Sequence, residues 1–218
     1  MVEIVERAAV LQLIASHRAQ LVEVLPRPEY EWAHLPGAVH LHLKELDADS
    51  AAALDTQRPV ITYCNNTECD MSPRAAVRLQ RLGLRQVYDY AGGKMDWLSF
   101  GLPFDGNADL VGNHLDRDVP TCPTDTTLAA LRERLGREAQ LCVVTDDHIL
   151  QGILTHDALH HQPGELTAEQ AMTFGVSTVR PSEEVKDLNE RMRRRRVALA
   201  IVTSSDGRLL GTYTPESG

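Results

Sequence analysis

The sequence predicts an α/β protein in two parts: a parallel sheet flanked by helices, followed by an α/β region built from a repeated unit. Apolar, β-branched segments alternate with amphipathic segments over the first half of the chain. Strands that alternate with helices in this way form parallel βαβ units. In the second half, a pattern recurs after roughly 58 residues, which predicts two copies of one unit sharing a core.

Local patterns predict the elements of the first part. Residues 6–18 carry apolar side chains at helical spacing, whereas residues 37–43 alternate in polarity with a period of two. Ser72 followed by Pro73 is typical of a helix start, so we expect a helix over residues 73–82. Further strands are expected at the apolar runs 21–25, 59–64 and 86–90.

The second part repeats one order of elements. Residues 119–135 resemble residues 176–192, and each segment is followed by an apolar strand and then by a second strand. Each unit is expected to contain strand, helix, strand and strand, with a second helix clear only in the first unit. The turn formers of residues 104–113 mark the boundary. The expected domains are residues 1–106 and residues 107–218, the latter divided into units of about 107–170 and 171–218.

Composition narrows the classes of partner. A net charge of -9 argues against nucleic acid as the main partner. No apolar run approaches the roughly 20 residues that span a bilayer. The segment MVEIVERAAV is too polar for a secretory signal. We therefore expect no membrane partner and a cytoplasmic location, where the four cysteines remain thiols.

Cys64 stands where an apolar strand segment meets a polar loop, with a helix soon after. Functional groups gather at the carboxyl ends of parallel strands. Backbone N–H groups and the positive end of a helix dipole stabilise a thiolate. We expect Cys64 to be a thiolate of low pKa that attacks a sulfur donor and holds a persulfide; the alternative is a buried structural cysteine. The candidate catalytic residues are Cys64, Asn65, Asn66, Thr67, Glu68, Cys69 and Asp70.

Two segments resemble the rhodanese family of sulfurtransferases. His34, Pro36, Gly37 and Ala38 match the family's His-x-Pro-Gly-Ala turn. The active-loop half is matched by Tyr63–Cys64, Gly92–Gly93 and Trp97. The resemblance covers residues 1–105 and implies a rhodanese-like parallel five-stranded sheet, with Cys64 forming the persulfide. It also implies two partners, a sulfur donor and a thiol acceptor. Glu23 replaces the family's usual Asp, and we expect it to bond the loop backbone or to cap a turn.

The loop departs from the family pattern. Cys69 occupies the position of an Arg, and the loop is longer, with Glu68 and Asp70 and no cation. Carboxylates raise the pKa of a nearby thiol and repel thiosulfate, so a protein persulfide or a small thiol is an alternative donor. Cys69 can also resolve an oxidised Cys64 into a disulfide, which leaves a redox sensor open as another function.

The repeated units resemble a tandem pair of CBS domains. The segment Gly152–Asp157 is the most specific match, and further matches occur at residues 121–125, 178–181 and 206–211. Such pairs commonly bind adenine nucleotides between the two units and associate through helices. The resemblance therefore implies AMP, ADP or ATP as a regulatory ligand and a homodimer. No cofactor is expected for catalysis, and no metal site is predicted.

The resemblance assigns nucleotide contacts to particular side chains. It assigns ribose recognition to Asp157 and a phosphate contact to Thr155. In the second unit Thr214 and Glu216 have the equivalent spacing. Alternatively, Asp157 caps the helix that follows. The leading hypothesis is a sulfurtransferase tuned by a nucleotide; the alternative is a catalytically silent rhodanese fold in a nucleotide-sensing regulatory protein.

Overall fold

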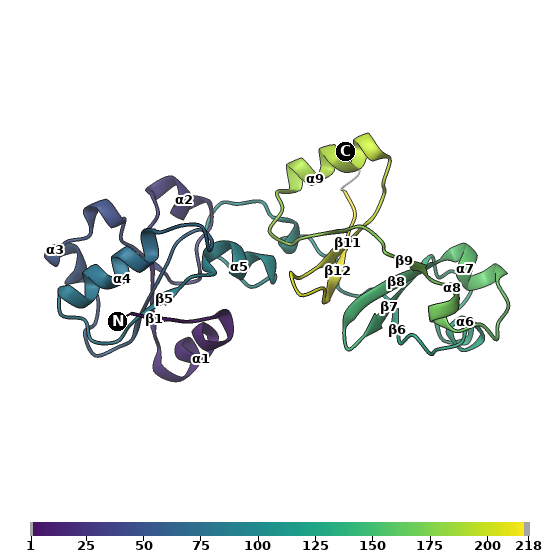
Figure 1. Ribbon diagram of the computed structural model, residues 1–218. Helices are drawn as coiled ribbons and strands as arrows, with labels where there is room; N and C mark the ends of the chain where they lie inside the picture. The colour runs from purple at the N-terminus through teal and green to yellow at the C-terminus, as the bar shows by residue number, and fades with distance from the viewer. Residues whose placement is uncertain (1, 216–218) are drawn as a thin grey trace. The chain divides into compact units, whose positions relative to one another are not determined.

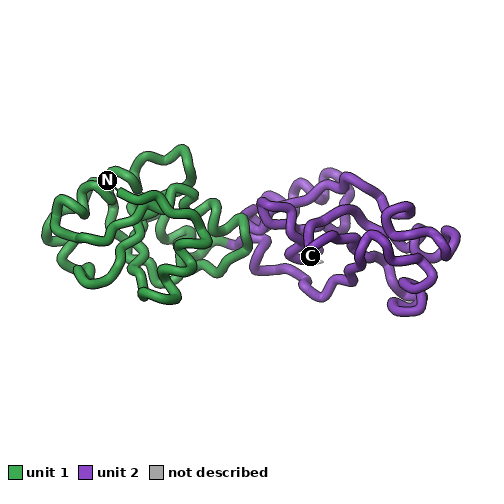
Figure 2. Tube along the Cα trace, turned by 60° about the horizontal axis from the view of Figure 1, so that its bottom comes forward, with its two compact units in different colours: residues 1–108 green, residues 109–218 purple. Residues whose placement is uncertain are grey.

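The computed structural model describes residues 2–215. These residues form two compact units that divide between Ala108 and Asp109 (Figure 2). The first unit has one sheet and the second has two, and the two repeats of the second unit have separate apolar clusters, not the shared core that the sequence predicted.

The first unit is built on a five-stranded sheet in the order β1-β5-β4-β2-β3. Every neighbouring pair of strands is parallel. The parallel five-stranded sheet expected from the sequence is thus confirmed, although its two-residue edge strand β1 is too short to produce a periodic pattern. The strands are β1 (Glu3–Ile4), β2 (Gln20–Glu23), β3 (Val39–His40), β4 (Val60–Tyr63) and β5 (Val87–Tyr90).

Helices cover both faces of this sheet. Figure 1 shows α3 and α4 on one side and α1 on the other. On the α4 side, Ala75, Ala76 and Leu79 pack against the strand residues Val60 and Val87, and burial of this apolar surface holds the helix over β4 and β5. The helices are α1 (Arg7–His17), α2 (Arg27–Trp32), η1 (Leu43–Glu45, a 3-10 turn), α3 (Ala48–Ala51), α4 (Met71–Arg81) and α5 (Gly93–Ser99).

Helix α4 begins two residues earlier than the sequence predicted. Asp70 is the N-cap and makes no side-chain capping bond, whereas Ser72 lies in the first turn and is 1% exposed. The expected capping role of Ser72 is therefore wrong. The reason is tertiary: the Ser72 hydroxyl lies 3.4 Å from the sulfur of Cys64.

The second unit contains two small sheets with one topology. In the first repeat β6 is parallel to β7, and β7 is antiparallel to β8; β10, β11 and β12 repeat this arrangement in the second. The expected pair of similar units is observed. The first repeat holds β6 (Thr121–Cys122), α6 (Leu128–Leu135), β7 (Leu141–Asp146), β8 (Ile149–Thr155), α7 (His156–His161), α8 (Ala168–Ala171) and β9 (Thr173–Phe174). The second holds β10 (Thr178–Val179), α9 (Val185–Arg195), β11 (Ala200–Thr203) and β12 (Leu209–Tyr213). The 3-10 turn η2 (Val111–Asn113) precedes β6 in the chain but packs against this second repeat through Val111.

None of the helices formed by residues 2–215 is both long enough and apolar enough to cross a lipid bilayer.

Candidate functional site

Cys64 directly follows β4, and helix α5 holds the start of its loop. The Lys94 N–H donates to the Cys64 carbonyl at 2.9 Å, and the Met95 N–H donates to the Asn65 carbonyl at 2.8 Å. Gly93 adopts a φ of +63°, and a Cβ there would lie 2.6 Å from the Cys64 carbonyl oxygen. Only glycine permits this close approach, so the Gly92–Gly93 turn determines where the cysteine sits.

The sulfur of Cys64 is buried in the core under α4. The residue is 1% exposed and belongs to the apolar cluster that contains Val60 and Ala76. Its Sγ lies 3.4 Å from the Cys69 carbonyl oxygen and 3.4 Å from the Ser72 hydroxyl. Burial, followed by hydrogen bonding to Cys69, raises the pKa of Cys64 to about 11. The expected thiolate of low pKa is therefore not found, because desolvation of the sulfur outweighs the nearby donors.

The loop uses its amides to stabilise itself. The Glu68 N–H donates to the Asn66 side-chain oxygen at 3.1 Å, and the Cys69 N–H donates to the Asn66 carbonyl at 3.1 Å. These two donors are therefore satisfied by Asn66. Instead, the side chain and backbone of Ser72 are the hydrogen-bonding groups that lower the pKa of Cys64.

The loop carboxylates lie away from the sulfur. Glu68 and Asp70 are exposed, as is Thr67, and Asp70 forms an ion pair with Arg74 at 3.4 Å. The sequence analysis expected these carboxylates to raise the pKa of Cys64, but they are not among the causes of its rise, the largest of which is burial. Charges on exposed side chains are screened by water and salt, so they influence the pKa of a buried thiol only weakly.

A buried carboxylate that the sequence analysis did not single out lies beneath the first turn of α4. Asp89 on β5 is 2% exposed and pairs in register with Thr62 on β4. The Thr62 hydroxyl donates to the Ser72 carbonyl at 3.2 Å. Burial raises the pKa of Asp89, and a side-chain hydrogen bond from Ser72 opposes that rise. The available signal was a carboxylate within the apolar segment QVYDY.

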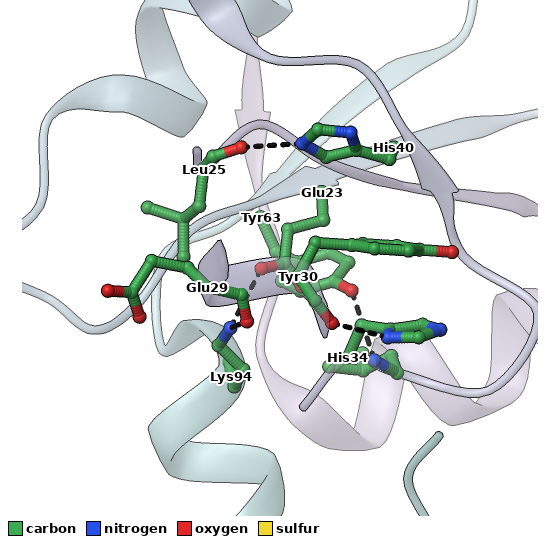
Figure 3. Close-up of polar contacts among 9 residues, drawn as sticks. Glu23, Leu25, Glu29, Tyr30, His34, His40, Tyr63 and Lys94 are labelled. Atoms are coloured by element: carbon green, nitrogen blue, oxygen red, sulfur yellow. Dashed lines mark hydrogen bonds and ion pairs between the residues drawn. The ribbon is translucent and has the colours of Figure 1, made fainter. Parts of the chain in front are cut away.

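Glu23 occupies a different environment from the one expected (Figure 3). Its carboxylate lies 2.8 Å from the ammonium of Lys94, and both side chains are fully buried. Lys94 also donates to the Glu29 carbonyl at 2.7 Å. Glu23 thus binds a lysine, and not the loop backbone. Burial raises the pKa of Glu23, and the charge of Lys94 opposes the rise. The sequence analysis did not predict a buried role for Lys94, because a lysine that follows two glycines is typical of an exposed turn.

Stacked rings brace the turn before β3. The Tyr30 and His34 rings stack with centroids 3.7 Å apart, and His34 Nδ1 lies 2.7 Å from the Tyr30 carbonyl oxygen. His40 Nε2 lies 2.8 Å from the Leu25 carbonyl oxygen (Figure 3). Each of these hydrogen bonds ties one ring nitrogen to a backbone carbonyl, so the two histidines hold the chain in place beside the Glu23–Lys94 pair.

Cations do lie beside the loop, although none lies within it. A groove of about 540 Å³ begins at Asp70 and Met71 and runs along α4. Its cationic lining consists of Lys44, Arg74, Arg78 and Arg81. The apolar side chains of Leu43 and Met71, which also line the groove, pack against the cluster that holds Cys64. Sequence reasoning did not identify this groove. Arg74, Arg78 and Arg81 share one face of α4 through their spacing of three and four, whereas Lys44 comes from η1.

In the second unit, the two predicted nucleotide contacts of the first repeat differ in role. The Thr155 hydroxyl accepts from the Ala158 N–H at 3.4 Å and caps α7. Asp157 lies in the first turn with its side chain 84% exposed, and it pairs with His161 at 3.0 Å. The capping residue is therefore Thr155, whereas the sequence analysis offered Asp157 for that role.

The equivalent position of the second repeat borders a different cavity. Thr214 lines a hollow of about 400 Å³ together with Asp109, His114, Asn189 and Tyr213. Neither Thr155 nor Asp157 is among the residues that line this hollow. Glu216, the other predicted contact, lies outside the described residues.

The two repeats meet along a short backbone ladder. The Leu150 N–H donates to the Gly207 carbonyl and the Leu209 N–H donates to the His148 carbonyl, each at 3.0 Å. A cavity of about 230 Å³ opens there. Its lining draws on both repeats and includes Arg117, Thr121, Thr145, His148, Leu210 and Gly211.

Comparisons with known proteins match both halves. The family model of the rhodanese-like domain matches residues 6–100. The CBS domain model matches residues 111–161 and again residues 168–217. The first unit is thus of the rhodanese-like class, as its parallel sheet and cysteine loop indicate. The whole chain is a rhodanese-like domain followed by a pair of CBS domains.

Individual relatives cover parts of the chain. The HTH-type transcriptional regulator Rv0324 of Mycobacterium tuberculosis is 36% identical over 104 residues, which are 48% of this chain and 45% of that protein. The chain therefore spans less than half of that relative. The thiosulfate sulfurtransferase GlpE of Coxiella burnetii is 28% identical over 96 residues, covering 44% of this chain and 87% of GlpE.

The cytosolic domain of the Mg2+ channel MgtE, solved in complex with ATP, is 18% identical, with a TM-score of 0.46. The match covers 79% of this chain and 64% of that one.

Proposed function

We propose that the rhodanese-like domain accepts a sulfur atom on Cys64 from a persulfide donor and passes it to an acceptor thiol. The observation that supports this most is the position of the sulfur at the carboxyl end of β4, 3.4 Å from the Ser72 hydroxyl. Carboxyl ends of parallel strands are where such folds place reacting groups. The cationic groove beside the loop offers an approach for a negatively charged donor.

The exchange needs no added oxidant or reductant. The deprotonated sulfur of Cys64 attacks the outer sulfur of the donor persulfide, the donor S–S bond breaks, and the donor leaves as a thiolate that takes up a proton. Cys64 then carries the persulfide. An acceptor thiolate attacks its outer sulfur in the same way and returns Cys64 to the thiol.

Burial makes the resting thiol unreactive toward solvent. With a pKa near 11, on the order of one Cys64 in ten thousand is ionised at pH 7. Attack on a small free donor is therefore slow. A donor that binds in the groove and displaces the cover of Met71 and Cys69 gains access to the sulfur, so we favour a protein persulfide over free thiosulfate as the donor.

Mass spectrometry of the intact chain tests this assignment. After incubation with a persulfidated peptide flanked by glutamates, or with thiosulfate in parallel, Cys64 of the native protein and of Cys69→Ser gains one sulfur atom, faster with the peptide, and Cys64→Ser gains none. Absence of the gain in folded native protein with both donors identifies a silent rhodanese fold. A Cys64–Cys69 disulfide after mild peroxide, without persulfide formation, identifies a redox sensor.

The CBS pair is the second part of the proposal: it binds an adenine nucleotide as a regulatory ligand. Arg117 and His148 in the cavity between the repeats suit a phosphate. Asp157, which does not line that cavity, offers an exposed carboxylate for ribose hydroxyls only if the nucleotide extends beyond it. The cavity of about 230 Å³ is smaller than the roughly 300–1,000 Å³ of ordinary ligand sites. Binding of a whole nucleotide therefore requires the repeats to move apart.

Thermal unfolding with AMP, ADP or ATP tests nucleotide binding. A bound nucleotide stabilises the folded state by an amount that grows with the logarithm of its concentration above Kd, so Tm rises with nucleotide concentration. The shift persists in Cys64→Ser and is lost in Asp157→Ala and in Arg117→Ala. Equal Tm values with and without each nucleotide, at millimolar concentration, contradict this part of the proposal.

A further inference from the structure

Helices α6 and α7 of the first CBS repeat pack against each other, and both line an open pocket. The pocket has a volume of about 560 Å³, which lies within the roughly 300–1,000 Å³ of ordinary ligand sites. Among residues 2–215, it shares no lining residue with the cavity between the repeats. We call it the α6–α7 pocket; its lining consists of Arg132, Glu133, Arg137, His156 and His160.

Positive charge predominates in this lining. Arg132 and Arg137 are cations, and neither forms an ion pair within residues 2–215. Glu133 and Arg137 have the spacing of four that suits an ion pair on a helix, but they form none. Helix α6 ends at Leu135, and Gly136 then turns the chain with a φ of +75°, so Arg137 lies outside the helix. The pocket therefore contains two cations without a counter-ion.

The guanidinium of Arg132 is held in one orientation. Its Nε donates to the Leu159 carbonyl and its Nη2 donates to the Gln162 carbonyl, both at the C-terminal end of α7. These carbonyls are neutral acceptors, so they fix the guanidinium without cancelling its charge. Because the side chain is already ordered, an anion that binds there loses little affinity to the ordering of that side chain.

The imidazoles of α7 add hydrogen-bond donors. His156 and His160 lie one turn apart, with ring centroids separated by 4.6 Å. His160 Nε2 lies 3.2 Å from the Ala139 carbonyl oxygen, and because a carbonyl only accepts, this nitrogen carries a proton. The ring nitrogens of His156 form no hydrogen bond within residues 2–215. The N–H of His156 is therefore free to bind a ligand oxygen.

The α6–α7 pocket suits an anion and not a metal ion. Within residues 2–215, no three His, Cys, Asp or Glu side chains are grouped so that they could hold a metal, and the two arginines would repel a cation. The acidic neighbour Asp157 pairs with His161 at 3.0 Å and does not line the pocket. Glu133 is thus the one carboxylate of the described lining, against two guanidinium groups.

We propose that the α6–α7 pocket binds inorganic phosphate or a small phosphate monoester. Arg132 and Arg137 bind the phosphate oxygens, since the planar guanidinium presents paired N–H groups that match them. The His156 N–H supplies a further donor. A phosphate dianion engages both cations, whereas a carboxylate carries only one charge. This site is additional to the nucleotide site proposed between the repeats and does not depend on it.

NMR of the histidine ring protons, recorded on the full-length chain at constant pH and ionic strength, tests the proposal directly. The His156 and His160 signals should shift in a saturable way as inorganic phosphate replaces chloride. Glycerol 3-phosphate, titrated in parallel, distinguishes the two sources of the phosphate group. Tighter binding of glycerol 3-phosphate identifies an ester as the ligand, and equal or weaker binding identifies inorganic phosphate.

Two substitutions should change the affinity in opposite directions. Arg137→Ala removes one of the two free cations and should weaken phosphate binding about fivefold. Glu133→Gln removes the repelling charge and should strengthen binding about threefold; a residue with only a structural role would not do so. Arg194→Ala, an exposed cation of α9 outside the lining, is the matched control and should change the affinity by less than about 1.5-fold.

Histidine signals that do not shift at up to about 20 mM phosphate, or equal affinities of native protein and Arg137→Ala, overturn the proposal. Arg137 and Glu133 are both exposed, and unchanged ligand-free spectra of the variants check that the fold is retained. Arg117→Ala, in the cavity between the repeats, should remove the nucleotide-dependent rise in Tm and leave phosphate binding intact. Loss of phosphate binding in Arg117→Ala would place the phosphate between the repeats and contradict the α6–α7 site alone.

Discussion

The ammonium of Lys94 lies 2.8 Å from a carboxylate oxygen of Glu23, and the backbone N–H of the same lysine donates to the Cys64 carbonyl at 2.9 Å. One residue of α5 therefore joins a fully buried ion pair to the cysteine loop. The pair is held from both sides, since the ammonium also binds the Glu29 carbonyl (Figure 3).

Removing the lysine charge should strongly destabilise the first unit. Lys94→Met leaves Glu23 charged and unpaired in the core, and breaking a buried pair in this way costs about 3–5 kcal/mol. Urea unfolding followed by circular dichroism measures the loss. The double variant Glu23→Gln/Lys94→Met should recover part of it, because no lone charge remains.

The exposed pair Arg27–Glu31 is the matched control for that experiment. Its side chains are 67% and 53% exposed, and such surface pairs contribute roughly 0–1 kcal/mol. Arg27→Met should therefore leave the unfolding midpoint nearly unchanged. Equal effects of Lys94→Met and Arg27→Met would contradict the importance of the buried pair.

The reactivity of Cys64 should rise steeply with pH. Burial raises its pKa to about 11, from the ordinary 9.0, so the thiolate fraction in the folded protein grows about tenfold per pH unit from 7 to 10. Iodoacetamide labelling of native protein should follow this slope and level off near pH 11. Labelling that is already at its plateau at pH 8 would show a thiol far more acidic than the buried geometry predicts.

The same shift makes a prediction about stability. The unfolded thiol ionises near pH 9 and the folded thiol near pH 11, so the native state retains a proton that the unfolded state loses. The contribution of Cys64 to stability is therefore complete below pH 9 and is lost as pH rises to 11, by about 2 kcal/mol. Comparing the Tm of native protein with that of Cys64→Ser at pH 8 and pH 10.5 isolates the contribution of Cys64 to stability. The Tm advantage of the native protein should shrink or reverse at the higher pH.

The positive charge of the groove along α4 should determine how fast an acidic donor transfers its sulfur. Arg78→Glu/Arg81→Glu reverses two cations that form no ion pair within the described part of the chain. Sulfur transfer from a persulfidated peptide flanked by glutamates should slow about tenfold or more at low salt, and less at high salt, since screening weakens the attraction. Arg85→Glu, exposed and outside the groove, should change the rate less than twofold. Equal rates for the two variants would remove the groove from the proposed function.

In the CBS pair, two neighbouring residues should affect different properties: Thr155 the stability of the fold, and Asp157 the binding of nucleotide. Thr155→Ala removes the cap of α7 and should cost about 1 kcal/mol of stability. Asp157→Ala removes an 84% exposed side chain and should leave the ligand-free Tm within about one degree, while abolishing the nucleotide-dependent shift. Differential scanning fluorimetry with and without ATP measures both values.

The sequence alone was sufficient for the architecture. The alternation of strand and helix patterns predicted the parallel sheet, and the similarity of residues 119–135 to 176–192 predicted two copies of one unit. These features are local in the chain, and their periods reflect which side of each element is buried. The position of Cys64 at the end of β4 also followed from the abrupt change from apolar to polar residues.

Only the tertiary structure decided the chemical state of the site. Glu23 and Lys94 are 71 positions apart, and Asp89, Ser72 and Cys64 come from β5, α4 and the end of β4. The pKa of a thiol depends on desolvation and on each donor and acceptor within a few ångströms. Those neighbours are chosen by the packing of α4 on the sheet, and no sequence window that contains Cys64 includes them all.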